Sequence, residues 1–301
     1  MNVKRLEDLI PVDPLEGSNI ECYRYLGSHW MDSLQNMELK LSTVSDFNDA
    51  FDGRGACTNV LRRELIVKHA KEIVSAQFNY PAHVIDKIVQ ELDPDDLVRT
   101  YSQGFAKAFL ERQMSKDWRI ACFAKPETSN ADALMWSHYA NHWKGVRLGY
   151  RLLFDLHKEI DFKEMTTPFI LDYVRYTDMR PVLDLSEIES FENDPVLIAY
   201  GHKVITTKSS EWSYESEWRL LVDTPKATVK YVCDTPVFFW RFHPLLLRTI
   251  DIGPDVPDKA RQELVDFVSY ISPYYRHVTI NQVELSTNTY SHEYKCILQG
   301  Q

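Results

Sequence analysis

Hydrophobic and polar positions alternate in several short segments near both ends of the chain, and this two-residue period is typical of half-buried strands. We predict strands at residues 21–26, 39–42, 118–124, 145–150, 169–176, 218–222, 229–233, 247–252 and 277–285. Apolar residues recur at helical intervals in residues 30–37, 60–77, 82–92, 95–114, 131–141 and 257–271. In the last of these helices, we expect an apolar stripe of Leu264, Val265, Val268 and Ile271 to face the core.

The order of these elements predicts the fold class. Strands come early and late with helices grouped between them, which favours an α+β fold over a doubly wound parallel sheet. The sequence shows no internal repeat, low-complexity tract or Gly/Ser linker, so we predict one α+β domain over residues 1–301 with a helical insertion at residues 60–117. The insertion has charged outer faces and no aromatic cluster, so we expect it to cover the sheet or recognise a partner, and to supply no catalytic group.

Composition narrows the class of protein. A formal net charge of −10 disfavours a protein that binds nucleic acid simply by covering its phosphates with basic groups. The five cysteines are odd in number and never form a Cys-x-x-Cys pair, which argues against a disulfide framework. No uncharged run approaches the roughly 20 residues that a membrane helix needs, and the charged residues 1–7 lead into no apolar signal-peptide segment. We therefore expect a cytoplasmic protein without membrane contact.

The first cluster whose side chains could take part in catalysis contains a Glu-x-Glu pair beside aromatic residues. Glu215 and Glu217 lie two positions apart, so on an extended strand both carboxylates would point to one face, beside Trp212 and Tyr214. Paired carboxylates in such a setting can stabilise a developing sugar cation or position a hydroxyl. The alternative is a solvated strand edge in which the glutamates pair with a basic neighbour such as Arg219, and for the spacing alone this alternative is favoured.

A second cluster lies on the helix predicted at residues 131–141. His138 and His142 are four positions apart, as in a zinc-binding helix, but no glutamate accompanies them, so we predict no metal site. Met135, Trp136 and Tyr139 share one helical face, which is usually a core face. A tryptophan or tyrosine at the rim of that face could still stack on a flat ligand.

The third cluster is on the first predicted strand. Tyr23 and Tyr25 share one face, and Arg24 points to the other. An arginine aimed inward needs an anion, which could be a phosphate or Glu217. The sequence contains no Gly-rich phosphate loop and no Gly-x-Ser-x-Gly motif, so we expect neither nucleoside triphosphate hydrolysis nor α/β-hydrolase chemistry.

Taken together, these clusters resemble a bacterial family of unknown function, DUF2971. The segments that carry the resemblance are residues 23–25, 45–52, 135–145 and 212–219, in this order along the chain. The resemblance runs from about Cys22 to Gly253. It identifies a family, and it implies no activity.

A more distant resemblance is to the ADP-ribosyltransferase fold, in which a split antiparallel or mixed sheet holds NAD. The order of residues 120–124, 139–140, 145–150 and 214–220 is similar to the order of the core motifs of that fold. By this resemblance Glu217 is the glutamate that contacts the nicotinamide ribose, and Glu215 completes the Glu-x-Glu pair of the Arg/Ser/Glu branch. Arg24 is its first-strand arginine, and Tyr139 is the tyrosine that stacks on nicotinamide in the His/Tyr/Glu branch.

The match mixes two branches of that superfamily. Cys122 stands where the second branch has a strand tyrosine, the Ser-Thr-Ser motif of the first branch is absent, and the first strand has no histidine. The resemblance implies NAD as the substrate, and a protein, a nucleic acid or water as the acceptor. The clusters and both resemblances together predict catalytic residues Glu217, Glu215 and Arg24, and binding residues Tyr23, Tyr25, Asn48, Trp136, Ser137, His138, Tyr139, Trp212, Tyr214 and Arg219.

Two other interpretations of the same residues stay open. One is a non-catalytic module that binds a ligand or a partner, as a sensor in a phage-defence or toxin–antitoxin system. The other is a structural network in which Arg24, Glu215, Glu217 and Arg219 form internal ion pairs. Whether Glu217 is already paired distinguishes an available carboxylate from a structural one.

Overall fold

The computed structural model describes residues 19–300 except 28, 79, 92–93, 114–117, 154–169 and 192–193. The charged segment 1–7 and parts of the predicted elements, residues 92, 114–117 and 169, lie outside the described residues. The described chain forms two compact units, which we describe separately. Unit 1 contains residues 47–113 and 177–209, and unit 2 contains residues 19–46, 118–176 and 210–300.

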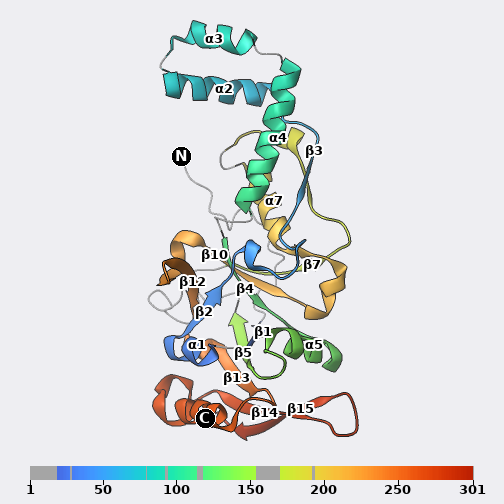
Figure 1. Cartoon of the computed structure of the whole chain (residues 1–301), viewed down its shortest axis with the longest axis vertical. Helices are drawn as coiled ribbons and strands as arrows, with labels where there is room; N and C mark the ends of the chain where they lie inside the picture. Colours follow the sequence, from blue (N-terminus) through green and yellow to red (C-terminus); the bar gives the residue numbers. More distant parts are fainter. Residues whose placement is uncertain are drawn as a thin grey trace. The chain divides into compact units, whose positions relative to one another are not determined.

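The largest element of unit 2 is a five-stranded sheet (Figure 1). Its strands, in spatial order, are β1 (Asn19–Leu26), β5 (Val146–Leu153), β13 (Leu247–Ile252), β14 (Thr279–Leu285) and β15 (His292–Leu298). All neighbours are antiparallel except β13 and β14, which run parallel. The sheet is therefore mixed, and its order brings the last strands of the chain beside segments from its first half.

Two three-stranded sheets complete the strands of the unit 2 core. One has the order β4 (Trp118–Phe123), β10 (Trp218–Asp223) and β6 (Ile170–Tyr173). The other has the order β11 (Thr228–Val232), β12 (Thr235–Arg241) and β2 (Glu38–Leu41). Single bridges from Tyr23 to Ala124 and from Ser42 to Ile120 connect β4 with β1 and with the end of β2. Large aromatic side chains such as Phe123, Trp240 and Phe242 fill the core between the sheets.

The helices of unit 2 lie at the margins of these sheets (Figure 1). They are α1 (Trp30–Asn36), α5 (Ser129–Tyr139) and α8 (Asp258–Asp266), with η8 (Phe267–Ile271), a π-helix, continuing α8. Leu264 and Val268 are buried as predicted, but Ile271 is 69% exposed, so its place in the apolar stripe is wrong. The wider turn of a π-helix shifts the residues that follow it around the helix axis, which moves Ile271 off the buried side.

Unit 1 contains three helices from the predicted insertion and a segment from much later in the chain. Its helices are α2 (Arg63–Phe78), α3 (Ala82–Glu91), α4 (Pro94–Gln113) and α7 (Pro195–Ile205). Figure 1 shows α2 and α3 side by side. A parallel pair of short strands, β3 (Ala56–Thr58) and β8 (Val182–Asp184), joins the two segments of the unit. The buried core of the unit includes Leu61, Ile66, Leu183, Ile188 and Tyr200.

The mixture of helices and open sheets agrees with the predicted α+β class. The pattern did not reveal α7, β12 and β15. Among the residues that the structure describes, no helix has both the length and the apolar character to cross a membrane.

Candidate functional site

The Glu-x-Glu segment differs from the extended strand that its spacing suggested. Glu215 is the last residue of η5 (Ser210–Glu215), a 3₁₀ helix, and Ser216 has a positive φ of 44°. Glu217 directly precedes β10. Because the segment is a tight turn, the prediction that a strand places both carboxylates on one face is wrong. Glu217 pairs with Arg219, and Glu215 accepts a hydrogen bond from Tyr139.

Glu217 forms a buried ion pair with Arg219. Arg219 Nε lies 2.9 Å from Glu217 Oε1, and Nη2 lies 3.1 Å from Oε2, so the contact is bidentate. Glu217 is 4% exposed and Arg219 is 0% exposed. The backbone N–H of Glu217 also donates to the hydroxyl of Tyr176 at 2.8 Å. Burial raises the pKa of Tyr176, and the negative charge of Glu217 raises it further.

Glu215 joins η5 to α5. The Tyr139 hydroxyl donates to Glu215 Oε1 at 2.6 Å. Glu215 is buried, whereas Tyr139 is half-buried. The half-buried rings of Trp212 and Tyr214 lie on the same 3₁₀ helix, 6.1 Å apart. We call Tyr139, Trp212, Tyr214 and Glu215 the α5–η5 site.

Arg24 lies beside the strand that precedes α5. Its Nη1 donates to the carbonyl oxygen of Cys122 at 2.6 Å. The thiol of Cys122 in turn contacts Glu217, and burial together with the charge of Glu217 raises the pKa of Cys122 well above its usual value. Arg24 and Glu217 therefore contact different groups of the same cysteine, the carbonyl oxygen and the thiol.

The other predicted binding residues are distributed between core and surface. Trp136 is fully buried, stacks on Trp143 with ring centroids 5.5 Å apart, and meets the edge of Tyr25. Neither Trp136 nor Tyr25 presents a free ring face to solvent, whereas His138 is exposed. Tyr23 and Ser137 are half-buried. Asn48 belongs to unit 1, in the loop before β3.

The helix that carries Tyr139 ends earlier than predicted. Asn141, His142 and Trp143 have positive φ values of 49°, 54° and 69°, which no right-handed helix contains. His138 and His142 therefore do not share a helical face. Within the described part of the chain, no group of three or more His, Cys, Asp or Glu side chains is placed to hold a metal ion.

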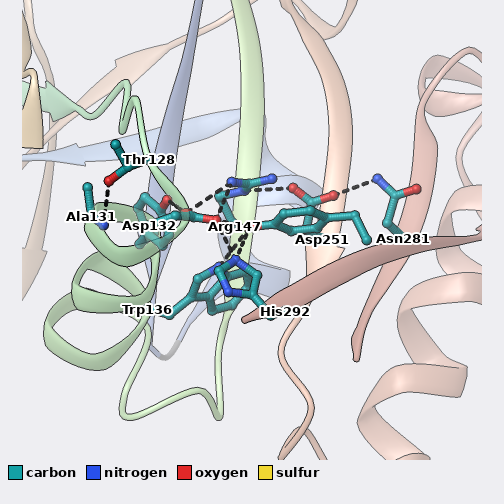
Figure 2. A network of polar contacts seen from close by, with 10 residues as sticks. Thr128, Ala131, Asp132, Trp136, Arg147, Asp251, Asn281 and His292 are labelled. Carbon is teal, nitrogen blue, oxygen red and sulfur yellow. Dashed lines mark hydrogen bonds and ion pairs between the residues drawn. The ribbon is translucent and has the colours of Figure 1, made fainter. Parts of the chain in front are cut away.

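A polar network that the sequence analysis did not identify anchors α5 to the five-stranded sheet (Figure 2). Its centre is Asp132, in the first turn of α5, which begins after the Thr128 cap. Arg147 Nη1 on β5 lies 3.1 Å from Asp132 Oδ1, and His292 Nε2 on β15 lies 2.7 Å from Oδ2. The hydroxyls of Tyr25 and Tyr294 also donate to Asp132.

Arg147 has a second carboxylate partner. Its Nε lies 2.8 Å from Asp251 Oδ2, and Asn281 Nδ2 donates to the other oxygen of Asp251 at 2.6 Å. The guanidinium carbon of Arg147 lies 4.1 Å from the ring centre of Tyr23 and 4.0 Å from that of Tyr294, so the cation sits between two aromatic faces. We call Asp132, Arg147, Asp251, His292 and Tyr294 the α5 clamp.

The clamp controls the ionisation of its own members. Burial raises the pKa of Asp132, but the hydrogen bond from His292 and the positive charge of Arg147 outweigh it, so this pKa lies below the usual 3.8. Burial also raises the pKa of Asp251, and there Arg147 and Asn281 offset only part of the effect. A charged residue inside an apolar strand, such as Arg147 in β5 or Asp251 in β13, was the available sequence signal for this network.

Comparison with protein families finds a match within unit 2 and part of unit 1. Residues 135–220 match the family described as Protein of unknown function (DUF2971), which confirms the DUF2971 resemblance predicted from the sequence. The matched segment begins within α5 and ends within β10, so it contains Tyr139, Arg147, Glu215 and Glu217. No curated protein and no solved structure matches the chain.

Proposed function

We propose that unit 2 is a ligand-binding module and that the α5–η5 site binds a nucleotide with a flat ring, of which NAD is the first to test. The observation that carries this proposal is the hydrogen bond from Tyr139 to Glu215, which joins α5 to η5 beside Trp212 and Tyr214. Half-buried aromatic rings bind flat ligands by stacking. The resemblance to ADP-ribosyltransferases supports NAD as the choice of nucleotide.

The buried ion pair of Glu217 favours ligand binding without catalysis. Glu217 is buried in a bidentate ion pair with Arg219, which is itself 0% exposed. To reach a ribose hydroxyl, Glu217 would have to leave a guanidinium that has no access to water, and separating a buried pair costs about 3–5 kcal/mol. The pairing supports the interpretation of Glu217 as a structural residue.

A second candidate function is NAD cleavage with transfer of ADP-ribose to a protein, a nucleic acid or water. It is favoured by the contacts of Cys122 with Arg24 and Glu217, which bring the first-strand arginine close to the late glutamate. In this function Glu217 would stabilise the oxocarbenium that forms as nicotinamide leaves. Both candidate functions are compatible with a role in a cytoplasmic phage-defence or toxin system.

The test is calorimetric titration of the whole protein with NAD, ADP-ribose and AMP, together with a measurement of nicotinamide release. We expect NAD to bind and nicotinamide not to be released. Tyr139→Phe removes a hydrogen bond to a carboxylate and should weaken NAD binding about tenfold or more. Tyr290→Phe removes the same hydroxyl from a fully exposed tyrosine and is the matched control.

Each alternative outcome has a clear meaning. No binding of any of the three nucleotides at millimolar concentration would refute the proposed function. Stoichiometric or catalytic release of nicotinamide, lost in a Glu217→Gln variant that keeps the stability of the wild type, would establish the second candidate instead.

A further inference from the structure

The anchor of α5 and its candidate ligand-binding residue lie on the same side of the helix. Asp132 and Tyr139 are seven residues apart, which is two helical turns and about 10 Å along the axis. Asp132 contacts the five-stranded sheet at one end of this face, and Tyr139 contacts Glu215 at the other. A displacement of Asp132 therefore also displaces Tyr139.

A single carboxylate connects α5 to three strands. Asp132 accepts hydrogen bonds from Tyr25 on β1, Arg147 on β5, and His292 and Tyr294 on β15 (Figure 2). Through Arg147 it is also coupled to Asp251 on β13. These strands are far apart in the chain, so the contacts fix α5 relative to the assembled sheet.

Stability alone does not explain why this network is charged. Replacing a buried ion pair by well-packed apolar residues is often neutral or stabilising, because both charges lose their hydration. Hydrogen bonds, however, depend on direction, and several of them converging on one carboxylate define a single position for the helix that carries it. Apolar packing alone, such as that of Met135, defines a position less strictly, and even Trp136 adds a hydrogen bond from its Nε1 to Tyr294.

We propose that Asp132, Arg147 and His292 are positioning residues, which hold α5 where Tyr139 meets Glu215 and so set the geometry of the α5–η5 site. The inference rests on the proposed function for the role of that site. The positioning of α5 itself is measurable without any ligand.

His292 offers the sharpest test because its substitution leaves both buried charges, Asp132 and Arg147, in place. His292→Leu removes one of the donors to Asp132, whereas His292→Gln restores an N–H group at a similar distance from the backbone. Glu293→Leu, an exposed neighbour on β15, is the matched control. Tyr294→Phe removes a hydroxyl that donates to Asp132 and accepts from Trp136 Nε1 at 3.0 Å, and it replaces His292→Leu in the test if that variant does not fold.

Hydrogen exchange of α5 amides and calorimetric titration with NAD are measured on all four full-length variants. We expect His292→Leu to raise exchange in Ser129–Tyr139 about tenfold over the wild type, with no change in β10. NAD affinity should fall by a similar factor, and His292→Gln should restore both values. Glu293→Leu should change neither.

Two results would overturn the positioning role. One is unchanged exchange in α5, and the other is an equal rise throughout unit 2, which would indicate general destabilisation. If α5 alone loosens but the wild type binds no NAD, the clamp positions the helix and the proposed function fails separately.

Discussion

At the scale of single residues, the carboxylates that could take part in catalysis or binding already have partners within the protein. Glu217 has Arg219, Glu215 has Tyr139, and Asp132 has Arg147 and His292. Each of these carboxylates is nearly inaccessible to water. Substituting any of them is therefore expected to change the free energy of unfolding. An effect on ligand binding has to be compared with that change in stability.

Glu217→Gln is expected to destabilise the protein by about 3–5 kcal/mol, because it removes the negative charge from a buried bidentate ion pair with Arg219. The measurement is chemical denaturation, with Glu293→Gln at an exposed position as the control. An unchanged unfolding free energy combined with loss of nicotinamide release would contradict the structural role of Glu217 and support catalysis.

Asp132 makes stability depend on pH in the acid range. Its folded pKa lies below the unfolded value of 3.8, so its contribution is fully present at higher pH and is lost as pH falls through the folded pKa. Asp132→Asn should remove the part of the fall in stability at low pH that is due to Asp132. It should also destabilise the protein by about 3 kcal/mol at pH 7. Denaturation between pH 2 and 7 (roughly the range over which carboxylates titrate) measures both effects, with exposed Asp234→Asn as the control. If the free energy of unfolding fell equally with decreasing pH in the wild type and in Asp132→Asn, this assignment would be contradicted.

At the scale of elements, the turn that follows α5 depends on close backbone packing. A Cβ added at Gly145 would lie 2.1 Å from the carbonyl oxygen of Leu26 and 2.9 Å from that of Ala140. Backbone atoms cannot rotate away as a flexible side chain can. The left-handed residues Asn141 and Trp143 precede this glycine, so α5 and β5 are joined through a turn with little freedom.

Gly145→Ala should destabilise unit 2 by about 1–3 kcal/mol, the usual cost of overpacking. Gly104→Ala is a control with the opposite expected sign, because Gly104 lies within α4 and a Cβ there meets no atom within 4 Å. Alanine in a helix interior is better than glycine by about 1 kcal/mol. Thermal unfolding of both variants provides the comparison, and a stable Gly145→Ala protein would show that the turn relaxes.

At the scale of the whole molecule, each unit has its own buried core. The α5–η5 site and the α5 clamp are built entirely from residues of unit 2. Helices α2, α3 and α4 contribute none of these residues. That the insertion supplies no catalytic group stays a prediction.

Charge reversal on the insertion should therefore leave nucleotide binding intact. Arg63→Glu with Lys107→Glu changes two exposed positions of unit 1, whereas Arg62 is a poor choice because it donates to the carbonyl oxygen of Ile188. We expect NAD affinity within about twofold of wild type, because neither residue belongs to the α5–η5 site and salt screens exposed surface charges. Complete loss of binding in a folded variant would refute the assignment.

The sequence alone was sufficient to predict the elements with a clear hydrophobic periodicity and the resemblance to the DUF2971 family. It gave β13 its exact bounds and β10 all but its last residue, because side-chain periodicity is a local property that a short window contains. The order of aromatic and charged clusters was also sufficient for the DUF2971 resemblance that residues 135–220 confirm. Both results depend only on the order and spacing of residues along the chain.

Only the tertiary structure decided how the charged side chains pair. His292 and Asp132 are 160 positions apart, and Arg147 and Asp251 are 104 apart, so no local pattern connects them. Even Glu215 and Glu217, only two positions apart, differ from expectation, because the positive φ of Ser216 turns the backbone between them. A buried charge takes whichever partner the packed sheet brings within hydrogen-bonding distance, and that choice is made by the assembled fold.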